Sequence, residues 1–256
     1  MQRYFIPEAN WDDNLVHIDG DDFHHIVRVM RMQIGDKIIC NQPTAKAAIC
    51  TITQIDETFV TAQVEEWLEN NSELPVFVTI AQGLPKGDKM DYVLQKGTEL
   101  GVHTFIPFQA ERSVVKWDAR KEEKKLSRFR KIVKEASEQS HRQLLPEIKS
   151  AMQLTELIEE SKSYQVKLFA YEEEAKTNTF HSLASMIRKL QEDDRVIICI
   201  GPEGGFSKEE VDALKQHHFI PVRLGPRILR TETAALYAMA SISYQLEELG
   251  GQSCQQ

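Results

Sequence analysis

Hydrophobic and polar positions alternate in short runs over residues 1–70, a pattern that predicts strands rather than long helices. Val60, Ala62 and Val64 lie on one face of such a strand, with polar residues between them. The strand-like runs cover residues 4–6, 37–40, 47–52 and 59–64. Between the first two of them, the apolar residues of segment 21–30 have the spacing of a helix. We therefore expect residues 1–70 to form a small β-barrel with one helix.

The pattern changes after residues 69–75, a polar, turn-rich segment that ends in proline and that we interpret as a linker. From there on, strand-like runs alternate with helical stretches. The strand-like runs are 76–81, 104–108, 165–171, 196–200 and 220–224, and the helical stretches are 86–100, 119–139, 154–160, 180–191, 207–216 and 231–246. This alternation is typical of a largely parallel sheet with helices on both faces. We expect one α/β domain over residues 75–250.

Two loops near the C-terminus are rich in glycine and proline. Residues 200–206 are Ile-Gly-Pro-Glu-Gly-Gly-Phe, and residues 224–234 are Leu-Gly-Pro-Arg-Ile-Leu-Arg-Thr-Glu-Thr-Ala. Proline fixes φ and glycine permits positive φ, so such loops adopt backbone shapes that other residues disfavour. Ligands of open α/β sheets bind outside the carboxyl ends of the strands, which is where both loops would lie. The sequence therefore predicts one pocket that both loops share.

Each loop leads directly into a helical stretch. Ser207 and Glu210 fit a capping box, and Thr231 can cap the last helix, so both loops would present free backbone N–H groups to a ligand. Neither loop has a P-loop lysine or the GxGxxG spacing, and Glu203 would lie near any pyrophosphate, so nucleotides are disfavoured. An uncharged or cationic ligand fits better. A tight turn without a ligand is the open alternative.

The formal net charge of −8 argues against a general binder of polyanions. The charge is uneven, however, because residues 112–142 contain eleven Lys and Arg against five Asp and Glu. Such a local excess fits a surface that faces phosphate groups. A solvated helix with internal i,i+4 ion pairs explains it equally well.

Several classes of protein are disfavoured by the sequence. There is no signal-peptide pattern at the N-terminus and no apolar run long enough to span a bilayer. The four cysteines are scattered, and the eight histidines form no metal-binding motif. We expect a cytoplasmic protein with reduced thiols, without a metal ion and without a membrane partner.

The last helical stretch has no charged residue between positions 233 and 246. A helix that is apolar on most sides is expected to be buried on most sides. We expect it both to pass through the domain core and to pack against a second subunit.

Residues 201–206 and 224–234 together resemble the signature of the SPOUT methyltransferases. Specifically, they resemble the bacterial family that methylates N3 of a uridine in 16S ribosomal RNA. Further segments that match this family extend from end to end of the chain, at residues 3–5, 24–31, 86–90, 95–101, 111–113 and 135–140.

The resemblance implies an α/β methyltransferase domain with a trefoil knot, a rare exception to the rule against threaded chains. It also implies a PUA-like β-barrel at the N-terminus that binds RNA. The implied cofactor is S-adenosylmethionine, and the implied partners are 16S ribosomal RNA in the small ribosomal subunit and a second copy of the chain. Three loops would contact the cofactor through Leu168, Ala170, Ile200, Gly201, Pro202, Glu203, Gly204, Gly205, Leu224, Gly225, Ile228, Leu229, Thr233 and Ala234. For Ile228 and Leu229, packing in the core is the alternative.

The implied reaction has one chemical difficulty. The sulfonium makes the methyl group a strong electrophile, but uracil N3–H is a weak acid and a poor nucleophile at neutral pH. Arg230 and Arg227 are the candidate cations that would stabilise the developing uracilate, as an oxyanion hole does. Glu232 or Glu203 could accept the proton. Two structural alternatives stay open: Glu232 could favour the positive end of its helix, and Glu203 could brace its loop.

The candidate RNA-binding residues come mainly from the first domain. At helical spacing, His24, Arg28 and Arg31 share one face. A solvated face is the alternative. The full set is Arg3, His24, His25, Arg28, Arg31, Arg112 and Arg142. Alternative functions are a methyltransferase that acts on a different RNA base, a non-catalytic RNA-binding assembly factor, and a dinucleotide oxidoreductase.

Overall fold

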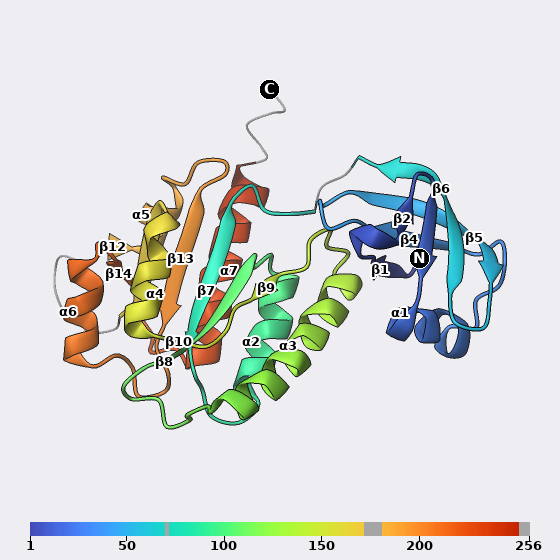
Figure 1. Cartoon of the computed structure of the whole chain (residues 1–256). Coiled ribbons are helices and arrows are strands. Elements are labelled where there is room, and N and C mark those ends of the chain that lie inside the picture. Colours follow the sequence, from blue (N-terminus) through green and yellow to red (C-terminus); the bar gives the residue numbers. More distant parts are fainter. Residues whose placement is uncertain (70–71, 172–180, 251–256) are drawn as a thin grey trace. The chain divides into compact units, whose positions relative to one another are not determined.

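The computed structural model describes residues 1–69, 72–171 and 181–250 (Figure 1). The chain divides into two compact units. The first consists of Met1–Glu73 together with Ser137–Leu145, and the second consists of Leu74–Ala136 and the described residues from Pro146 onward.

A six-stranded sheet forms the first unit. Its strands, in spatial order, are β1 (Arg3–Phe5), β4 (Lys37–Asn41), β5 (Ala47–Ile55), β6 (Val60–Leu68), β3 (Leu15–Ile18) and β2 (Trp11–Asp12). All neighbours are antiparallel except β1 and β4. The register between β5 and β6 shifts at two places, and such irregularities increase the local bend of a strand. The sheet accordingly curls into a half-barrel (Figure 1).

The interior of this half-barrel is apolar. Val60 and Ala62 are fully buried, as their alternation predicts, while Val64 packs at the margin of the core. The expected helix forms as α1 (Gly20–His24) and continues as a π-helical segment, His25–Val29. Ile26 anchors this segment, because its side chain is fully buried in the same core. The short strands β2 and β3 and the 3-10 turn Glu8–Asn10 were not expected.

A parallel sheet forms the second unit, as predicted. Its order is β10 (Met152–Gln153), β8 (Thr104–Gln109), β7 (Phe77–Gly83), β13 (Arg195–Ile200), β11 (Val166–Ala170), β14 (Ile220–Arg223) and β12 (His181–Ser182), and β9 (Glu147–Ile148) also pairs with β8. Every pair in this sheet is parallel.

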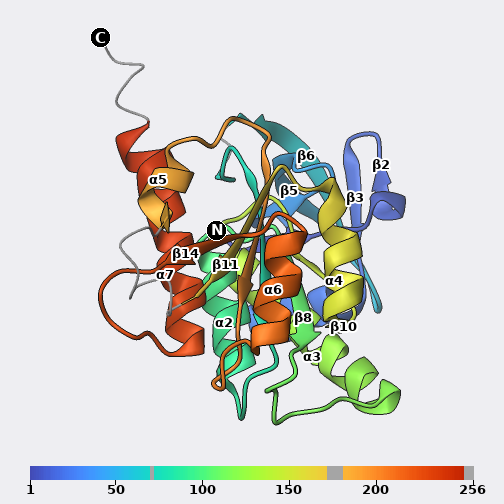
Figure 2. The same cartoon turned by 90° about the vertical axis from the view of Figure 1, so that its left-hand side faces the viewer.

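Helices cover both faces of the parallel sheet (Figure 2). One apolar cluster joins a face of the sheet to four helices: α2 (Lys89–Glu99), α3 (Ala119–Gln139), α5 (Leu183–Ile187) and α7 (Thr231–Ser243). A second cluster joins the opposite face to α4 (Leu154–Glu160), which a 3-10 turn at Ser161–Ser163 extends, and to α6 (Lys208–Gln216).

Helix α7, which has no charged residue from Thr233 to Ser243, lies partly in the first of these clusters, where Ala235, Ala238 and Met239 are buried. Its other face is open, with Tyr237 40% exposed, and the chain continues as a π-helical segment, Tyr244–Leu249. The prediction that α7 passes through the core is confirmed. Packing against a second subunit stays a prediction.

The described cysteines, Cys40, Cys50 and Cys199, are buried free thiols, and Cys254 lies outside the described residues. Burial raises the pKa of the Cys199 thiol, which keeps it protonated and unreactive. No helix in the described ranges has both the length and the apolar character needed to cross a membrane.

Candidate active site

The two glycine loops meet at one cavity of about 1150 Å³ in the second unit. They follow β13 and β14, which flank β11 in the sheet, so both leave the sheet at its carboxyl edge. Most residues assigned to the cofactor line this cavity, namely Ala170, Ile200, Gly201, Pro202, Glu203, Gly204, Gly205, Leu224, Gly225, Ile228, Leu229 and Ala234.

Two residues assigned to the cofactor lie elsewhere. Leu168 is 2% exposed in β11 and packs in the hydrophobic core, so its side chain does not reach the cavity. Thr233 is exposed on the first turn of α7 and is not part of the cavity lining. The third expected loop follows Tyr171, and its residues 172–180 lie outside the described residues.

The first loop is packed closely at two glycines, one in the loop itself and one at the end of β7. A Cβ atom on Gly83, at the end of β7, would lie 2.6 Å from Cδ of Pro202. A Cβ atom on Gly204 would lie 3.0 Å from Cβ of Arg112, whose Nη1 donates a hydrogen bond to the Gly204 carbonyl over 3.2 Å. Gly83 was not among the predicted site residues, because it is separated from Pro202 by most of the domain sequence.

Helix α6 begins with the predicted capping box. Ser207 Oγ accepts a hydrogen bond from the amide of Glu210 at 3.2 Å, and Glu210 Oε2 accepts one from the amide of Ser207 at 2.8 Å. Glu210 Oε1 also accepts from the amide of Glu111 at 2.8 Å. The box therefore fixes both the helix start and the loop that follows β8.

The prediction that Thr231 caps α7 is wrong. Arg230 occupies the N-cap position and makes no side-chain cap. Thr231 Oγ1 instead donates to the carbonyl of Gly201 over 2.6 Å and accepts from Nε2 of Gln82 over 2.7 Å. The hydroxyl thus links the second loop to the first loop and to β7. Gln82, a fully buried polar residue at the end of an apolar strand, was missed as a site residue.

The candidate cations line the cavity. Arg227 and Arg230 are exposed side chains of the second loop, and Ile228 between them is 77% exposed, which excludes core packing for Ile228. Leu229 is half-buried and packs against the core of the unit. Glu232 is not part of the lining.

Lys89, the first residue of α2, joins the two candidate glutamates and was not predicted as a site residue. Its Nζ lies 2.7 Å from Oε1 of Glu203 and 3.8 Å from Oε2 of Glu232. Burial alone would raise the pKa of Glu203, but hydrogen bonds from Lys89 and from the amide of Lys86 outweigh it and lower the pKa. These contacts attach the first loop to the start of α2, so Glu203 braces its loop.

The predicted RNA-binding residues of the first unit divide into two groups. His24, Arg28 and Arg31 are exposed on or just after the helix, and Arg31 has a positive φ of 54°. His25 is half-buried, with Nδ1 3.0 Å from the hydroxyl of Tyr4.

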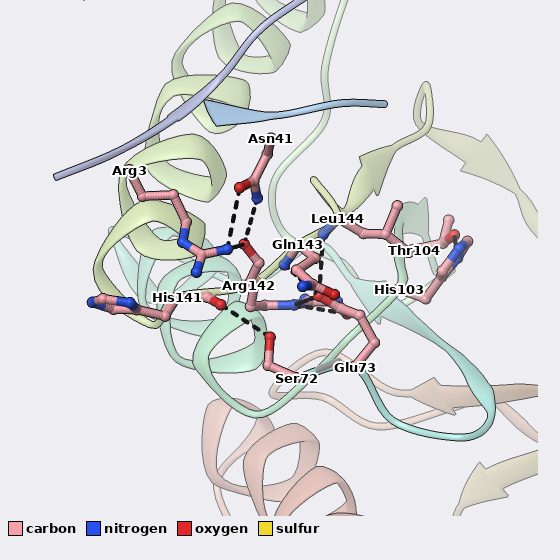
Figure 3. Close-up of polar contacts among 10 residues, drawn as sticks. All are labelled: Arg3, Asn41, Ser72, Glu73, His103, Thr104, His141, Arg142, Gln143 and Leu144. Carbon is pink, nitrogen blue, oxygen red and sulfur yellow. Dashed lines mark hydrogen bonds and ion pairs between the residues drawn. The ribbon is translucent and has the colours of Figure 1, made fainter. Parts of the chain in front are cut away.

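Arg3 and Arg142 are instead buried (Figure 3). Arg3 Nη1 donates to Oδ1 of Asn41 over 3.1 Å and to the carbonyl of Arg142 over 3.2 Å. The guanidinium of Arg142 donates to the Glu73 carboxylate, with Nε 3.1 Å from Oε2. Both arginines therefore hold the segment Ser137–Leu145 within the first unit instead of facing solvent. Arg112, in contrast, is exposed and lines the cavity of the second unit.

Within residues 1–69, 72–171 and 181–250, no three His, Cys, Asp or Glu side chains gather as the ligands of a metal ion would.

Comparison with known proteins agrees with this geometry. Residues 72–243 match the family described as RNA methyltransferase domain, and residues 18–65 match the RNA methyltransferase PUA domain. The chain is 44% identical to the ribosomal RNA small subunit methyltransferase E of Bacillus subtilis, over 98% of this chain and 99% of that protein.

Two solved structures with bound cofactor are also similar. A ribosomal RNA small subunit methyltransferase E from Neisseria gonorrhoeae, bound to S-adenosylmethionine, is 29% identical with a TM-score of 0.82, over 95% of this chain and 97% of that one. A putative methyltransferase from Legionella pneumophila, in complex with the same cofactor, is 31% identical with a TM-score of 0.81, over 94% and 96%. The chain thus belongs to the RNA methyltransferase family, together with the ribosomal RNA small subunit methyltransferases E.

Proposed function

We propose that this protein transfers a methyl group from S-adenosylmethionine to N3 of a specific uridine in the 16S ribosomal RNA of the small ribosomal subunit. The observation that carries the proposal is the cavity formed by both glycine loops at the carboxyl edge of the sheet. It occurs in a chain that is 44% identical, over nearly its whole length, to a ribosomal RNA small subunit methyltransferase E.

The residues of the cavity fit this cofactor. Ligand pockets commonly have volumes of roughly 300–1,000 Å³, so a cavity of about 1150 Å³ leaves room for a cofactor and part of a second substrate. The close approaches at Gly83 and Gly204 keep side chains out of the first loop and leave its backbone to face the ligand. We propose that Leu229 and Ile228 flank the adenine and that the loop amides bind its edge. Bound S-adenosylmethionine would supply an electrophilic methyl group.

The chain's own residues would activate the uracil. As N3 loses its proton, negative charge spreads onto the neighbouring carbonyl oxygens, and Arg230, supported by Arg227, would stabilise that charge. Glu203 is a weak candidate for the proton acceptor, because Lys89 and the Lys86 amide lower its pKa. Glu232 is the second candidate: no donor among the described residues makes a hydrogen bond to its buried Oε2, but its side chain does not line the cavity.

We further propose that the first unit, a PUA-like domain expected over residues 1–70, binds the RNA through His24, Arg28 and Arg31. In the second unit, expected over residues 75–250, Arg112 is a separate candidate for contact with RNA. Arg3 and Arg142 are excluded from the proposed contact because their guanidinium groups are buried and bound within the protein.

Three other expectations belong to the same proposal. The second unit would carry a trefoil knot, in keeping with the hydrogen bond that links Thr231 in the second loop to Gly201 in the first. The open face of α7 around Tyr237 would pack against a second copy of the chain. An enzyme that acts on ribosomal RNA would be cytoplasmic.

Methyl transfer is tested by incubating the protein with methyl-labelled S-adenosylmethionine and with purified small or large ribosomal subunits. We expect label in RNA of the small subunit and little in RNA of the large subunit. Label in RNA of the large subunit alone would replace the proposed substrate. Cofactor binding without any transfer to RNA would favour a non-catalytic assembly factor.

A further inference from the structure

Lys89 is one of five cationic residues that line the cavity from outside both glycine loops; the others are Arg112, Lys208, Lys215 and Arg223. Lys89 begins α2, and its ammonium lies between the carboxylates of Glu203 and Glu232 at 2.7 and 3.8 Å. Its side chain is 30% exposed and lines the cavity, whereas the Glu232 side chain is 16% exposed and does not. The two glutamates therefore hold the ammonium of a residue that lines the cavity.

The hydrogen bonds of this cluster leave Lys89 with donor capacity. An ammonium group has three N–H donors. One is used at Glu203 Oε1, and 3.8 Å to Glu232 Oε2 is an ion-pair distance that is too long for a hydrogen bond. The Glu203 hydrogen bond is the largest of the influences that raise the pKa of Lys89, so this group stays charged at neutral pH.

We propose that Lys89 is a catalytic residue of the methyl transfer, and that its ammonium donates a hydrogen bond to a uracil carbonyl oxygen next to N3. The inference rests on the proposed function. N3 forms a bond to the methyl carbon while the sulfur–carbon bond breaks and leaves its electron pair on sulfur. The N3 proton passes to one of the two glutamates that contact Lys89, so a sulfonium and a carboxylate become a neutral thioether and a neutral carboxyl group. Lys89 stabilises the charge on the carbonyl oxygen while the proton leaves.

Other charged groups surround the same site and share the electrostatic effect. Arg230, at the start of α7, repels the positive charge of Lys89 and so acts to lower the pKa of Lys89. The remaining charged residues of the lining are Arg112, Glu203, Lys208, Asp212, Lys215, Arg223 and Arg227. Removing Lys89 leaves the arginines, so the expected result is a partial loss of rate.

The variant Lys89→Met tests this role, with Lys96→Met as its matched control. Lys96 lies on the same helix and pairs with Glu99. Loss of a preorganised donor costs roughly 10²–10³ in kcat, and we expect roughly 10- to 100-fold here because Lys89 is partly solvated. Affinity for S-adenosylmethionine, measured by calorimetry, should change less than about twofold. Lys89→Arg should restore most of the rate, because it keeps a charged donor.

Two further measurements separate catalysis from bracing. Without Lys89 the uracil N3–H should be less acidic in the site, so the rising limb of the kcat–pH profile should move to higher pH. RNA in which 5-fluorouridine replaces uridine has a more acidic N3–H. With this RNA, the difference in kcat between Lys89→Met and wild type should be smaller. The variant Glu203→Gln removes the ion pair with Lys89 and shows how much bracing of the first loop contributes to cofactor affinity.

The outcomes are distinct. If the wild-type protein methylates RNA and the rate of Lys89→Met equals that of Lys96→Met, the inference is overturned. A loss of cofactor affinity in Lys89→Met that matches Glu203→Gln, with kcat preserved at saturating cofactor, would also overturn it and leave Lys89 as a brace. Wild-type protein that transfers no methyl group would instead refute the proposed function.

Discussion

The buried pair of Glu73 and Arg142 offers the sharpest prediction about the first unit. Glu73 Oε1 accepts hydrogen bonds from the amides of Gln143 at 2.8 Å and Leu144 at 3.1 Å, and its other oxygen binds the Arg142 guanidinium (Figure 3). Their side chains are 9% and 4% exposed. Burial lowers the pKa of Arg3, and the charge of Glu73 opposes that effect. One carboxylate therefore supports two buried guanidinium groups.

The variant Glu73→Gln keeps the size of the side chain and one acceptor oxygen for the two amides. It also places an NH2 group against the guanidinium and removes the Glu73 charge with which Arg142 pairs. Breaking a buried ion pair by removing one partner costs about 3–5 kcal/mol. With a urea m-value of about 2 kcal/mol per molar, the unfolding midpoint of the first unit should fall by about 2 M.

Tryptophan fluorescence can follow this unit by itself. Trp11 and Trp67 stack on each other in the first unit, with ring centroids 5.7 Å apart. Changing Trp117 to Phe removes the third tryptophan, which belongs to the second unit. The control is Glu65→Gln, because Glu65 pairs with Lys37 in an exposed position where an ion pair contributes little. A Glu73→Gln midpoint no lower than that of the control would refute the argument from burial.

Four further predictions concern pH and the site. Burial would raise the pKa of Glu73, but the hydrogen bonds from Arg142 and from the two amides lower it. The ionised carboxylate therefore stabilises the fold above the unfolded pKa of about 4.3, and this stabilisation is lost as pH falls through the lower folded pKa. Over this pH range, the urea unfolding midpoint should fall less in Glu73→Gln than in wild type. Gly83→Ala should weaken S-adenosylmethionine binding roughly 5- to 100-fold in calorimetry, from an overpacking cost of about 1–3 kcal/mol against Pro202; unchanged affinity would separate the loop from the cofactor. Arg230→Ala should lower the methylation rate far more than cofactor affinity, and an unchanged rate would remove it from the mechanism. Arg28→Glu should weaken RNA binding and flatten its salt slope, measured by filter binding, whereas equal affinity would point to the basic residues of α3.

Local sequence patterns predicted the larger elements. The strands and helices of the second unit follow from apolar periodicity, and the start of α6 follows from two residues three positions apart, Ser207 and Glu210. These predictions succeed because the forces that define them act within one turn or one strand. Strands as short as Trp11–Asp12 lack enough residues to show a period.

Long-range contacts could not be predicted from those patterns. From its sequence neighbours, Arg3 was expected to be exposed and to bind RNA. It is buried instead, because it binds Asn41 and Arg142, which are 38 and 139 residues away in the sequence. Thr231 was assigned to its own helix, but its hydroxyl binds Gly201 across 30 residues. A polar side chain takes the nearest partner in space, which depends on the tertiary fold.

The candidate site contains residues that local patterns predicted and residues that depend on long-range contacts. The glycine and proline loops were identified because their composition requires special backbone shapes, and they do line one cavity. Lys89 and Gln82 were missed as site residues because each reaches the loops from a different element, α2 and β7. Gln82 has no local signal apart from a polar residue beside an apolar run. Lys89 lies in residues 86–90, a segment that matches the family but to which no site role was assigned.

The most direct test of the central claim is the chemical position of the transferred methyl group. Small ribosomal subunits from cells that lack this gene would be incubated with the protein and tritiated S-adenosylmethionine, and the RNA would then be digested to nucleosides. The account predicts that the label is recovered in 3-methyluridine. Label in any other nucleoside, or no label in spite of measurable cofactor binding, would contradict it.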